Sequence, residues 1–241
     1  NELPAPDSAS SQPAYPWRGL ITCDPKEGGA ASVNGTSVAR DQVEAFASGG
    51  LWSYRHLIEH YVSLAKQAGG VDMFIIGSEM RGLTRVRDEN SAFPFVEELR
   101  SLAAHAKEEL GASCTVTYGA DWSEYFGHQP CDGSNDVFYN LDPLWADPAI
   151  DAVGIDNYFP LSDWRDSGDP VGEARSISDA HYLAEGLAGG ESFDWFYASD
   201  TDRTAGVRTP ITDGLGKPWV FRPKDIKSWW ENPHIERRGG V

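Results

Sequence analysis

The hydrophobic and polar residues of this chain alternate between two patterns. A continuous apolar run, which is typical of a strand buried on both faces, occurs at 71–77, and further strands are predicted at 17–23, 114–122, 149–159 and 217–221. Apolar residues at helical spacing lie between them, at 40–48, 52–68, 93–111, 176–190 and 223–232. The order of strands and helices therefore predicts a parallel α/β sheet or barrel.

The helix predicted at 52–68 has an apolar stripe that we expect to face the core. Its members are Tyr54, Leu57, Ile58, Tyr61, Leu64, Ala65 and Ala68. The same helix contains "HLIEH", in which His56, Glu59 and His60 match a zinc-protease pattern of two metal-binding imidazoles and a basic Glu. These side chains lie opposite the stripe and no third ligand is identifiable, so we expect a solvated helix face and no metal site.

Three predicted strands end in a carboxylate: Glu79 after "FIIGS", Asp121 after "TVTYGA" and Asp156 after "AVGI". In a (β/α)8 barrel the carboxyl ends of all strands meet at one mouth, where the active site lies. We therefore expect the three carboxylates to converge. The structural alternative is that each Asp hydrogen-bonds the following loop and that Glu79 forms a salt bridge with Arg81 or Arg85.

Length and charge limit the functions that the chain could have. Its 241 residues allow one domain or at most two, and the first 16 residues, rich in Pro, Ser and Ala, read as a linker. A net charge of −17 argues against binding nucleic acid. No apolar run approaches the ~18 to 20 residues of a membrane span. Both ends of the chain look like cuts through a longer polypeptide.

Other candidate sites carry less support. Cys23, Cys114 and Cys131 are widely spaced, which fits neither a disulfide framework nor a zinc site. The stretch "CDGSNDVF" is rich in oxygen ligands but lacks the Gly at the sixth position and the terminal Glu of an EF-hand calcium loop, so we expect a turn there. Neither a GxGxxG nor a GxxxxGK[ST] motif occurs, which removes the main support for nucleotide binding. We expect no cofactor.

Several long stretches carry a family resemblance. They are "WRGLITCDP", "GGVDMFIIGSEMRGLT", "YGADWSEYF", "LDPLWADPAIDAVGIDNY", "GGESFDWFYASD", "VRTPITDG" and "PWVFRPKDIKSWWENPH". At these positions the chain resembles the glycoside-hydrolase-like TIM-barrel domain of phage-type tail proteins, which occurs in the large tail hub protein of the gene transfer agents of alphaproteobacteria.

The resemblance implies a (β/α)8 barrel of the clan A glycosidase type over 17–241, incomplete at the C-terminus, with an N-terminal truncation as an open alternative. Glu79 matches the acid/base Glu at the end of the fourth strand. Ser78 stands where the clan usually has an Asn that holds a sugar hydroxyl. The nucleophile Glu of the seventh strand is expected after Val241, because the late Glu231 and Glu236 follow no apolar strand.

Further residues are candidates for holding the sugar. Asp121 and Asp156 with Asn157 offer oxygens and an amide to hydroxyl groups, and Trp122, Tyr158 and Trp164 offer flat faces to sugar rings, with Tyr125 as an extension of that platform. The alternative for Trp122 and Tyr158 is packing beneath the loops.

The resemblance thus implies a tail protein of a phage-like particle, assembled in the bacterial cytoplasm and acting at the recipient cell envelope. Its partners would be envelope polysaccharide or peptidoglycan, bound or cleaved during particle entry, and other tail proteins that contribute to host specificity. The alternative is an inactive structural or glycan-binding module of the tail tip.

Overall fold

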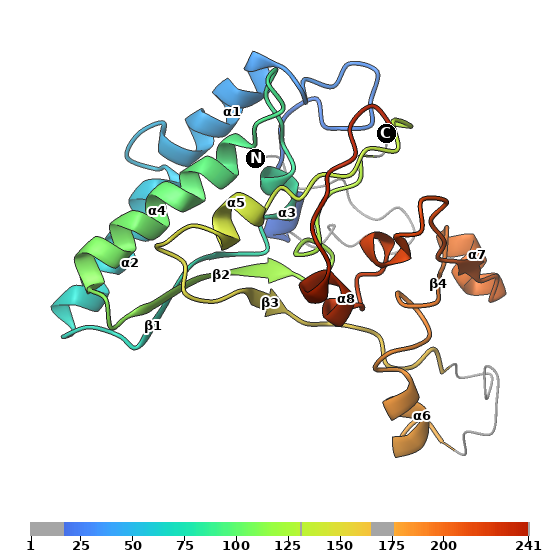
Figure 1. Cartoon of the computed structure of the whole chain (residues 1–241). Coiled ribbons are helices and arrows are strands. Elements are labelled where there is room, and N and C mark those ends of the chain that lie inside the picture. Colours follow the sequence, from blue (N-terminus) through green and yellow to red (C-terminus); the bar gives the residue numbers. More distant parts are fainter. Residues whose placement is uncertain (1–16, 131, 165–175, 241) are drawn as a thin grey trace, which may run out of the picture. The chain divides into compact units, whose positions relative to one another are not determined.

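A computed structural model describes residues 17–130, 132–164 and 176–240. The described chain divides into two compact units, the first formed by 17–156 with 235–240 and the second by 157–234 (Figure 1). Each unit is described by itself below. The predicted linker at 1–16 and Cys131 lie outside the described residues.

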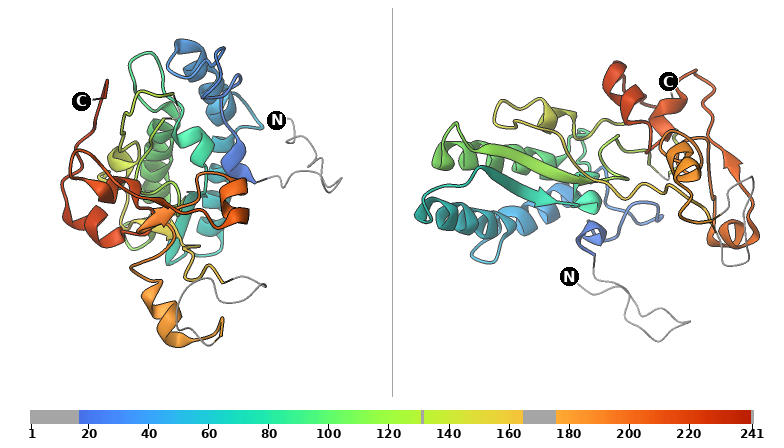
Figure 2. Two further views of the ribbon diagram at one scale, coloured as in Figure 1. Left: turned by 90° about the vertical axis from the view of Figure 1, so that its right-hand side faces the viewer. Right: turned by 90° about the horizontal axis from the view of Figure 1, so that it is seen from below.

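The first unit is built on a parallel sheet, as predicted. Its strands are β1 (Met73–Ser78), β2 (Thr115–Asp121) and β3 (Gly154–Asp156), in the order β1-β2-β3. The right view of Figure 2 shows β1 and β2 side by side. The apolar runs at 71–77 and 114–122 therefore form strands, whereas only the last part of 149–159 does so. The described residues form this three-stranded parallel sheet and no complete barrel.

Helices cover one face of the sheet (Figure 1). They are α1 (Ser37–Ser48), α2 (Tyr54–Gln67) and α4 (Pro94–Leu110). Two short helices accompany them: α3 (Arg81–Thr84), between β1 and α4, and α5 (Asp142–Trp145), between β2 and β3. Pro94 opens α4, and Gly111 ends it at a φ of 87°, which favours glycine. The fully buried side chains of α4 pack with those of the strands: Leu99, Leu102, Ala103 and Ala106 with Ile76, Val116, Tyr118 and Ala120. This layer is the core of the unit.

The orientation of α2 differs from the prediction. Ile58 and Val62 are buried, whereas Leu57, Tyr61 and Leu64 are 49%, 54% and 43% exposed. The helix has apolar residues on two faces, and contact with α1 and α4 selects the row that contains Ile58 and Val62. Sequence spacing alone contains no information about which of two apolar rows finds a partner.

Two predicted strands are wrong. Residues 17–23 contain a 3-10 turn, η1 (Arg18–Leu20), and residues 217–221 contain η2 (Pro218–Phe221). Gly19 lies against the Trp17 ring, since a Cβ at Gly19 would stand only 2.4 Å from that ring. Pro218 lacks the backbone N–H that a strand interior needs. Both short apolar runs therefore pack as turns.

The second unit has little regular structure. It contains α6 (Ala180–Glu185), β4 (Trp195–Phe196), α7 (Asp200–Ala205), β5 (Thr209–Pro210), η2 and α8 (Ile226–Glu231). β4 and β5 pair antiparallel. The helices predicted at 176–190 and 223–232 are present but shorter. Its small apolar core contains Ile211, Val220 and Trp229.

The last described segment returns to the first unit. Arg237 pairs with Val137 through two backbone hydrogen bonds, and Glu236 accepts a hydrogen bond of 3.3 Å from the Tyr139 backbone N–H. Glu236 also pairs with Arg238 at 2.7 Å. These contacts give Glu236 a structural role, and Glu236 was not among the catalytic residues predicted from the sequence. Among the described residues, none of the helices has the length and apolarity to cross a membrane.

Candidate functional site

Glu79 follows β1 in an uncommon backbone conformation. Its φ is 54°, in the left-handed region that side chains other than glycine rarely adopt. The Glu79 N–H donates to the Gly119 carbonyl at 2.8 Å, so the residue is still tied to the sheet. Such strain costs of order 1–3 kcal/mol and persists only where neighbouring contacts impose it.

The contacts that impose this conformation lie on both sides of Glu79. After it, the Met80 N–H donates to the buried Tyr118 hydroxyl at 2.7 Å. Before it, the Tyr54 hydroxyl donates to the Ile76 carbonyl at 2.8 Å and passes so close to Gly77 that a Cβ there would stand 2.0 Å away. The close approach of Tyr54 therefore requires a glycine at position 77. Hydrogen bonds from the Met80 N–H and to the Ile76 carbonyl thus hold the chain on both sides of Glu79.

The Glu79 carboxylate is oriented by the N-terminal turn. Its Oε2 accepts a hydrogen bond of 2.7 Å from Trp17 Nε1 and lies 3.6 Å from Arg18 Nη2. Glu79 is only 8% exposed. The salt bridge expected with an arginine of the following loop is made instead with Arg18, and Arg85 donates to the Ser123 carbonyl at 2.7 Å. Sequence reasoning missed Trp17 and Arg18, because 62 residues separate Trp17 from Glu79.

Ser78 and Asp156 meet at the same edge of the sheet. Ser78 Oγ donates to Asp156 Oδ2 at 2.7 Å. The register of β1 against β2 shifts between Ile75 and Ser78, which places Ser78 opposite Gly119. A Cβ at Gly119 would lie 3.3 Å from the Asp156 oxygens, so this glycine leaves room for the contact. Asp121 is the register partner of Asp156 on β2.

Asp121 also has a structural task. Its Oδ1 accepts hydrogen bonds from the Ser123 backbone N–H, at 2.8 Å, and from the Ser123 hydroxyl. The residue is 6% exposed. Trp122, next along the chain, is half-buried. Asp121 therefore shapes the turn after β2, as the structural alternative expected, and stands next to Asp156.

A buried carboxylate that sequence reasoning did not single out supports this edge. Glu124 is fully buried and accepts hydrogen bonds from Thr84 Oγ1 at 2.6 Å, Tyr118 OH at 3.0 Å and the Asp121 N–H at 3.0 Å. Burial raises the pKa of Glu124 to about 7, although the three donors and Arg85 favour its charged form. Burial also lowers the pKa of Arg85 to about 9. The sequence feature that could have indicated Glu124 is its position three residues after the strand-terminal Asp121.

Three predicted sugar-binding residues belong to the second unit. Asn157 is exposed, and its Oδ1 accepts a hydrogen bond of 2.9 Å from the Phe159 N–H. Tyr158 is 70% exposed, so packing beneath a loop is wrong for this residue. Trp164 packs edge-on against Tyr182, with ring centroids 6.2 Å apart. In the first unit, Tyr125 is 1% exposed, which removes it as an extension of an aromatic platform.

The expected turn at "CDGSNDVF" is present. Asp132 Oδ1 accepts a hydrogen bond from the Ser134 N–H at 2.9 Å. His56 and His60 of "HLIEH" are exposed on α2. In the part of the chain that the structure describes, no group of three or more His, Cys, Asp or Glu side chains is arranged to hold a metal ion.

Comparison with known proteins places the chain in a family. Residues 52–241 match the model of the GTA TIM-barrel-like domain, where GTA stands for gene transfer agent. Searches of curated proteins and of solved structures gave no match. The matched region covers the second unit and the first unit from Trp52 onward, and it includes the edge formed by Ser78, Glu79, Asp121 and Asp156. The strand–helix order, the parallel sheet and this match agree that the chain belongs to the family of GTA TIM-barrel-like domains.

Proposed function

We propose that this domain acts on the cell-envelope glycan of a recipient cell, as a tail component of a gene transfer agent particle. The proposal rests on one observation: Glu79 is strained, mostly buried and oriented by Trp17 and Arg18 at the carboxyl edge of a parallel sheet. Strained residues of this kind cluster at functional sites. The carboxyl edge is also where barrel enzymes bind their substrates.

In the proposed chemistry, Glu79 is the general acid/base of glycoside hydrolysis. The contacts of its carboxylate with Trp17 and Arg18 both involve Oε2, and the proposal assigns Oε1 to the glycosidic oxygen. Retaining hydrolysis needs a second carboxyl group about 5 to 5.5 Å away, and inverting hydrolysis needs one about 6.5 to 9.5 Å away. In the proposal this second group is the nucleophile Glu that the resemblance implies for the seventh strand.

The neighbouring polar groups have supporting tasks in this proposal. Ser78 and Asp156 form a hydrogen-bonded pair with further oxygen lone pairs available to sugar hydroxyls. Trp122, half-buried beside Asp121, offers part of its ring to a sugar face. Glu124 and Tyr118 are positioning residues, because they hold the Met80 N–H and do not themselves contact the glycan.

A second candidate function is glycan binding without cleavage. It is favoured by the contacts of Trp17 and Arg18, which already occupy Oε2 of Glu79, and by Ser78 in place of the usual Asn. In that case the strained edge would recognise the envelope glycan and keep the particle at the cell surface. Asn157, Tyr158 and Trp164, in the second unit, remain candidates for glycan contacts of their own.

One experiment separates the two functions. The complete natural polypeptide is incubated with purified cell-wall glycan, and both the bound protein and the released reducing ends are measured. Glu79→Gln is compared with Glu108→Gln, a control in which an exposed Glu of α4 loses the same charge. Release that falls by orders of magnitude only in Glu79→Gln supports hydrolysis. Binding without release in all three proteins supports the binding function, and absence of both overturns the proposal.

A further inference from the structure

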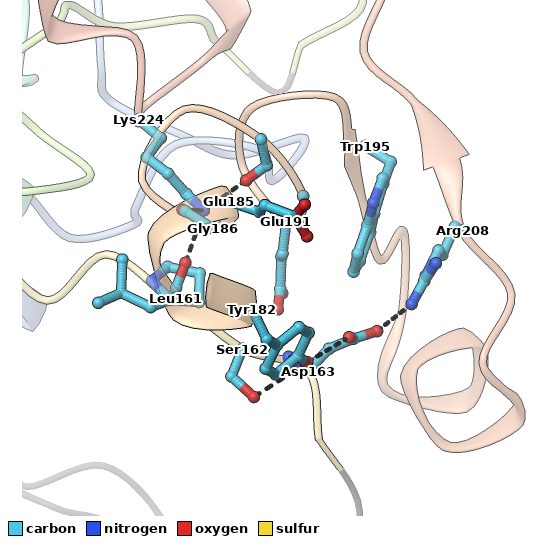
Figure 3. Close-up of a pocket in the computed structure, with 13 residues that line it drawn as sticks. Leu161, Ser162, Asp163, Tyr182, Glu185, Gly186, Glu191, Trp195, Arg208 and Lys224 are labelled. Carbon is cyan, nitrogen blue, oxygen red and sulfur yellow. Dashed lines mark hydrogen bonds and ion pairs between the residues drawn. The ribbon is translucent and has the colours of Figure 1, made fainter. Parts of the chain in front are cut away.

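The second unit contains a pocket that the proposed function does not use. It has a volume of about 200 Å³ and lies between the 160–163 segment, α6, the glycine-rich turn after α6, and the β4–β5 pair (Figure 3). The side chains that line it and carry the argument are Ser162, Asp163, Tyr182, Trp195, Arg208 and Lys224. Every one of them belongs to the second unit.

The pocket is held in shape by a buried cation. Lys224 is 5% exposed, and its Nζ donates to the carbonyls of Pro160, Gly186 and Gly189 at 2.6, 2.7 and 2.8 Å. Figure 3 shows this ammonium group among the loop carbonyls. An ammonium group has three hydrogens, so all of its donors are used. Lys224 thus fixes three pocket-lining segments and presents no donor of its own to a ligand.

The opposite wall combines an ion pair with an aromatic ring. Asp163 pairs with Arg208 and lies 3.3 Å from the Tyr182 hydroxyl and 3.4 Å from the Tyr197 hydroxyl. The Arg208 guanidinium stands 4.3 Å from the centre of the Trp195 ring. Figure 3 shows Asp163 joined to Arg208, with Trp195 beside the guanidinium. These contacts fix the side chains before any ligand arrives, which lowers the entropy cost of binding.

The chemistry of the lining selects a class of ligand. Asp163, Glu185 and Glu191 supply three carboxylates, of which Asp163 pairs with Arg208 and Glu191 pairs with Arg203 at 2.6 Å. Both cations of the lining, Arg208 and Lys224, also have partners, so an anion would find no unpaired cation among these lining residues. A hydrocarbon would leave the many polar groups unpaired, which costs free energy. A neutral ring with several hydroxyls uses carboxylates as acceptors, Arg208 N–H groups as donors and Trp195 as a flat surface. The single hydrogen of the Tyr182 hydroxyl goes to Asp163 Oδ1, so Tyr182 holds this acceptor in place.

From this arrangement we infer that the pocket is a second carbohydrate site, which binds a single sugar ring. Its size agrees, because pockets for larger ligands measure roughly 300–1,000 Å³, whereas this one measures about 200 Å³. The site contains neither Glu79 nor any other residue of the first unit. It binds and does not cleave, and it adds a second point of attachment to the glycan-directed function proposed above.

Saturation-transfer NMR tests the inference with glucose, galactose and N-acetylglucosamine as probes, in the complete polypeptide. At least one sugar should give a saturable signal in the millimolar range. Asp163→Asn and Tyr182→Phe should weaken that binding about tenfold or more, because the first removes a charged acceptor and the second removes the hydroxyl that donates to Asp163 Oδ1. Tyr61→Phe, an exposed Tyr of α2, is the matched control and should bind normally.

Two further comparisons make the test decisive. Tyr182→Phe should lose the sugar signal and keep the glycan cleavage measured above, so loss of glycan cleavage and loss of this site are separate results. Tyr182→Phe removes one hydroxyl and spares the Asp163–Arg208 pair, so the test stands even where Asp163→Asn fails to fold. The inference is overturned by the absence of saturable binding up to about 100 mM, by normal binding in a folded Tyr182→Phe, or by saturable binding of inorganic phosphate, followed by phosphorus NMR, in place of the sugars.

Discussion

The Tyr118 hydroxyl lies 3.0 Å from Glu124 Oε1, and both side chains are fully buried beneath the edge that carries Glu79. The same hydroxyl accepts a hydrogen bond from the Met80 N–H at 2.7 Å. The Tyr118 hydroxyl therefore links Glu124 to the backbone N–H of Met80, the residue after Glu79. A buried carboxylate in this position makes the edge sensitive to pH.

The first prediction concerns Glu124→Gln. Burial raises the folded-state pKa of Glu124 to about 7, above the ordinary 4.5. The folded state then binds the proton more tightly than the unfolded state, so this contribution to stability is complete below pH ~4.5 and is lost as pH rises to ~7. At about 1.4 kcal/mol for each pH unit, the loss is of order 3 kcal/mol.

Chemical denaturation between pH 5 and 8 measures this effect. The free energy of unfolding of the wild type should fall across the range by more than that of Glu124→Gln, and the two curves should differ most in slope between pH 5 and 7. Parallel curves would contradict a raised pKa at Glu124. Glu108→Gln, exposed on α4, is the control and should follow the wild type.

The second prediction concerns the contact between Tyr54 and Gly77. A Cβ at Gly77 would lie 2.0 Å from the Tyr54 hydroxyl but 3.3 Å from the ring carbon that bears it. Gly77→Ala should therefore destabilise the protein by about 1–3 kcal/mol. In a Tyr54→Phe background the clash is absent, so the same substitution should cost much less. A double-mutant cycle of urea denaturation measures the coupling, and strict additivity would disprove the clash.

The third prediction concerns Lys224→Met. Loss of the ammonium group leaves the carbonyls of Pro160, Gly186 and Gly189 without this donor. Each unsatisfied buried acceptor costs about 1–3 kcal/mol. Hydrogen exchange should show faster opening of the second unit, with the core of the first unit unchanged. Lys227→Met, at an exposed position of α8, removes an equal charge and should leave exchange as it is in the wild type.

The fourth prediction tests the orientation of α2. Val62 is 1% exposed and Leu57 is 49% exposed. Val62→Ala should cost about 1–3 kcal/mol, because it opens a cavity beneath the helix. Leu57→Ala should change stability by less than about 0.5 kcal/mol. The two variants are compared by their midpoints of thermal unfolding. An equal decrease in both midpoints would support burial of the predicted apolar stripe that contains Leu57.

Part of this architecture could be predicted from local pattern. The apolar runs that became β1 and β2, and the helical periodicity of α2 and α4, arise from neighbours in the chain. Gly111 as the end of α4 follows from the backbone conformation that glycine tolerates. Tertiary contacts decided which apolar row of α2 is buried, because both rows satisfy the same spacing. They also turned 17–23 and 217–221 from expected strands into 3-10 turns.

The candidate site was likewise predictable only in part. The sequence by itself determined that Glu79, Asp121 and Asp156 follow successive strands, and parallel strands bring their carboxyl ends to one edge of a sheet. Only the tertiary structure decided which groups touch those carboxylates. Trp17 is 62 positions from Glu79, and Ser78 is 78 positions from Asp156. Contacts across such separations depend on the register of the strands and the path of the loops, which no local pattern of residues encodes.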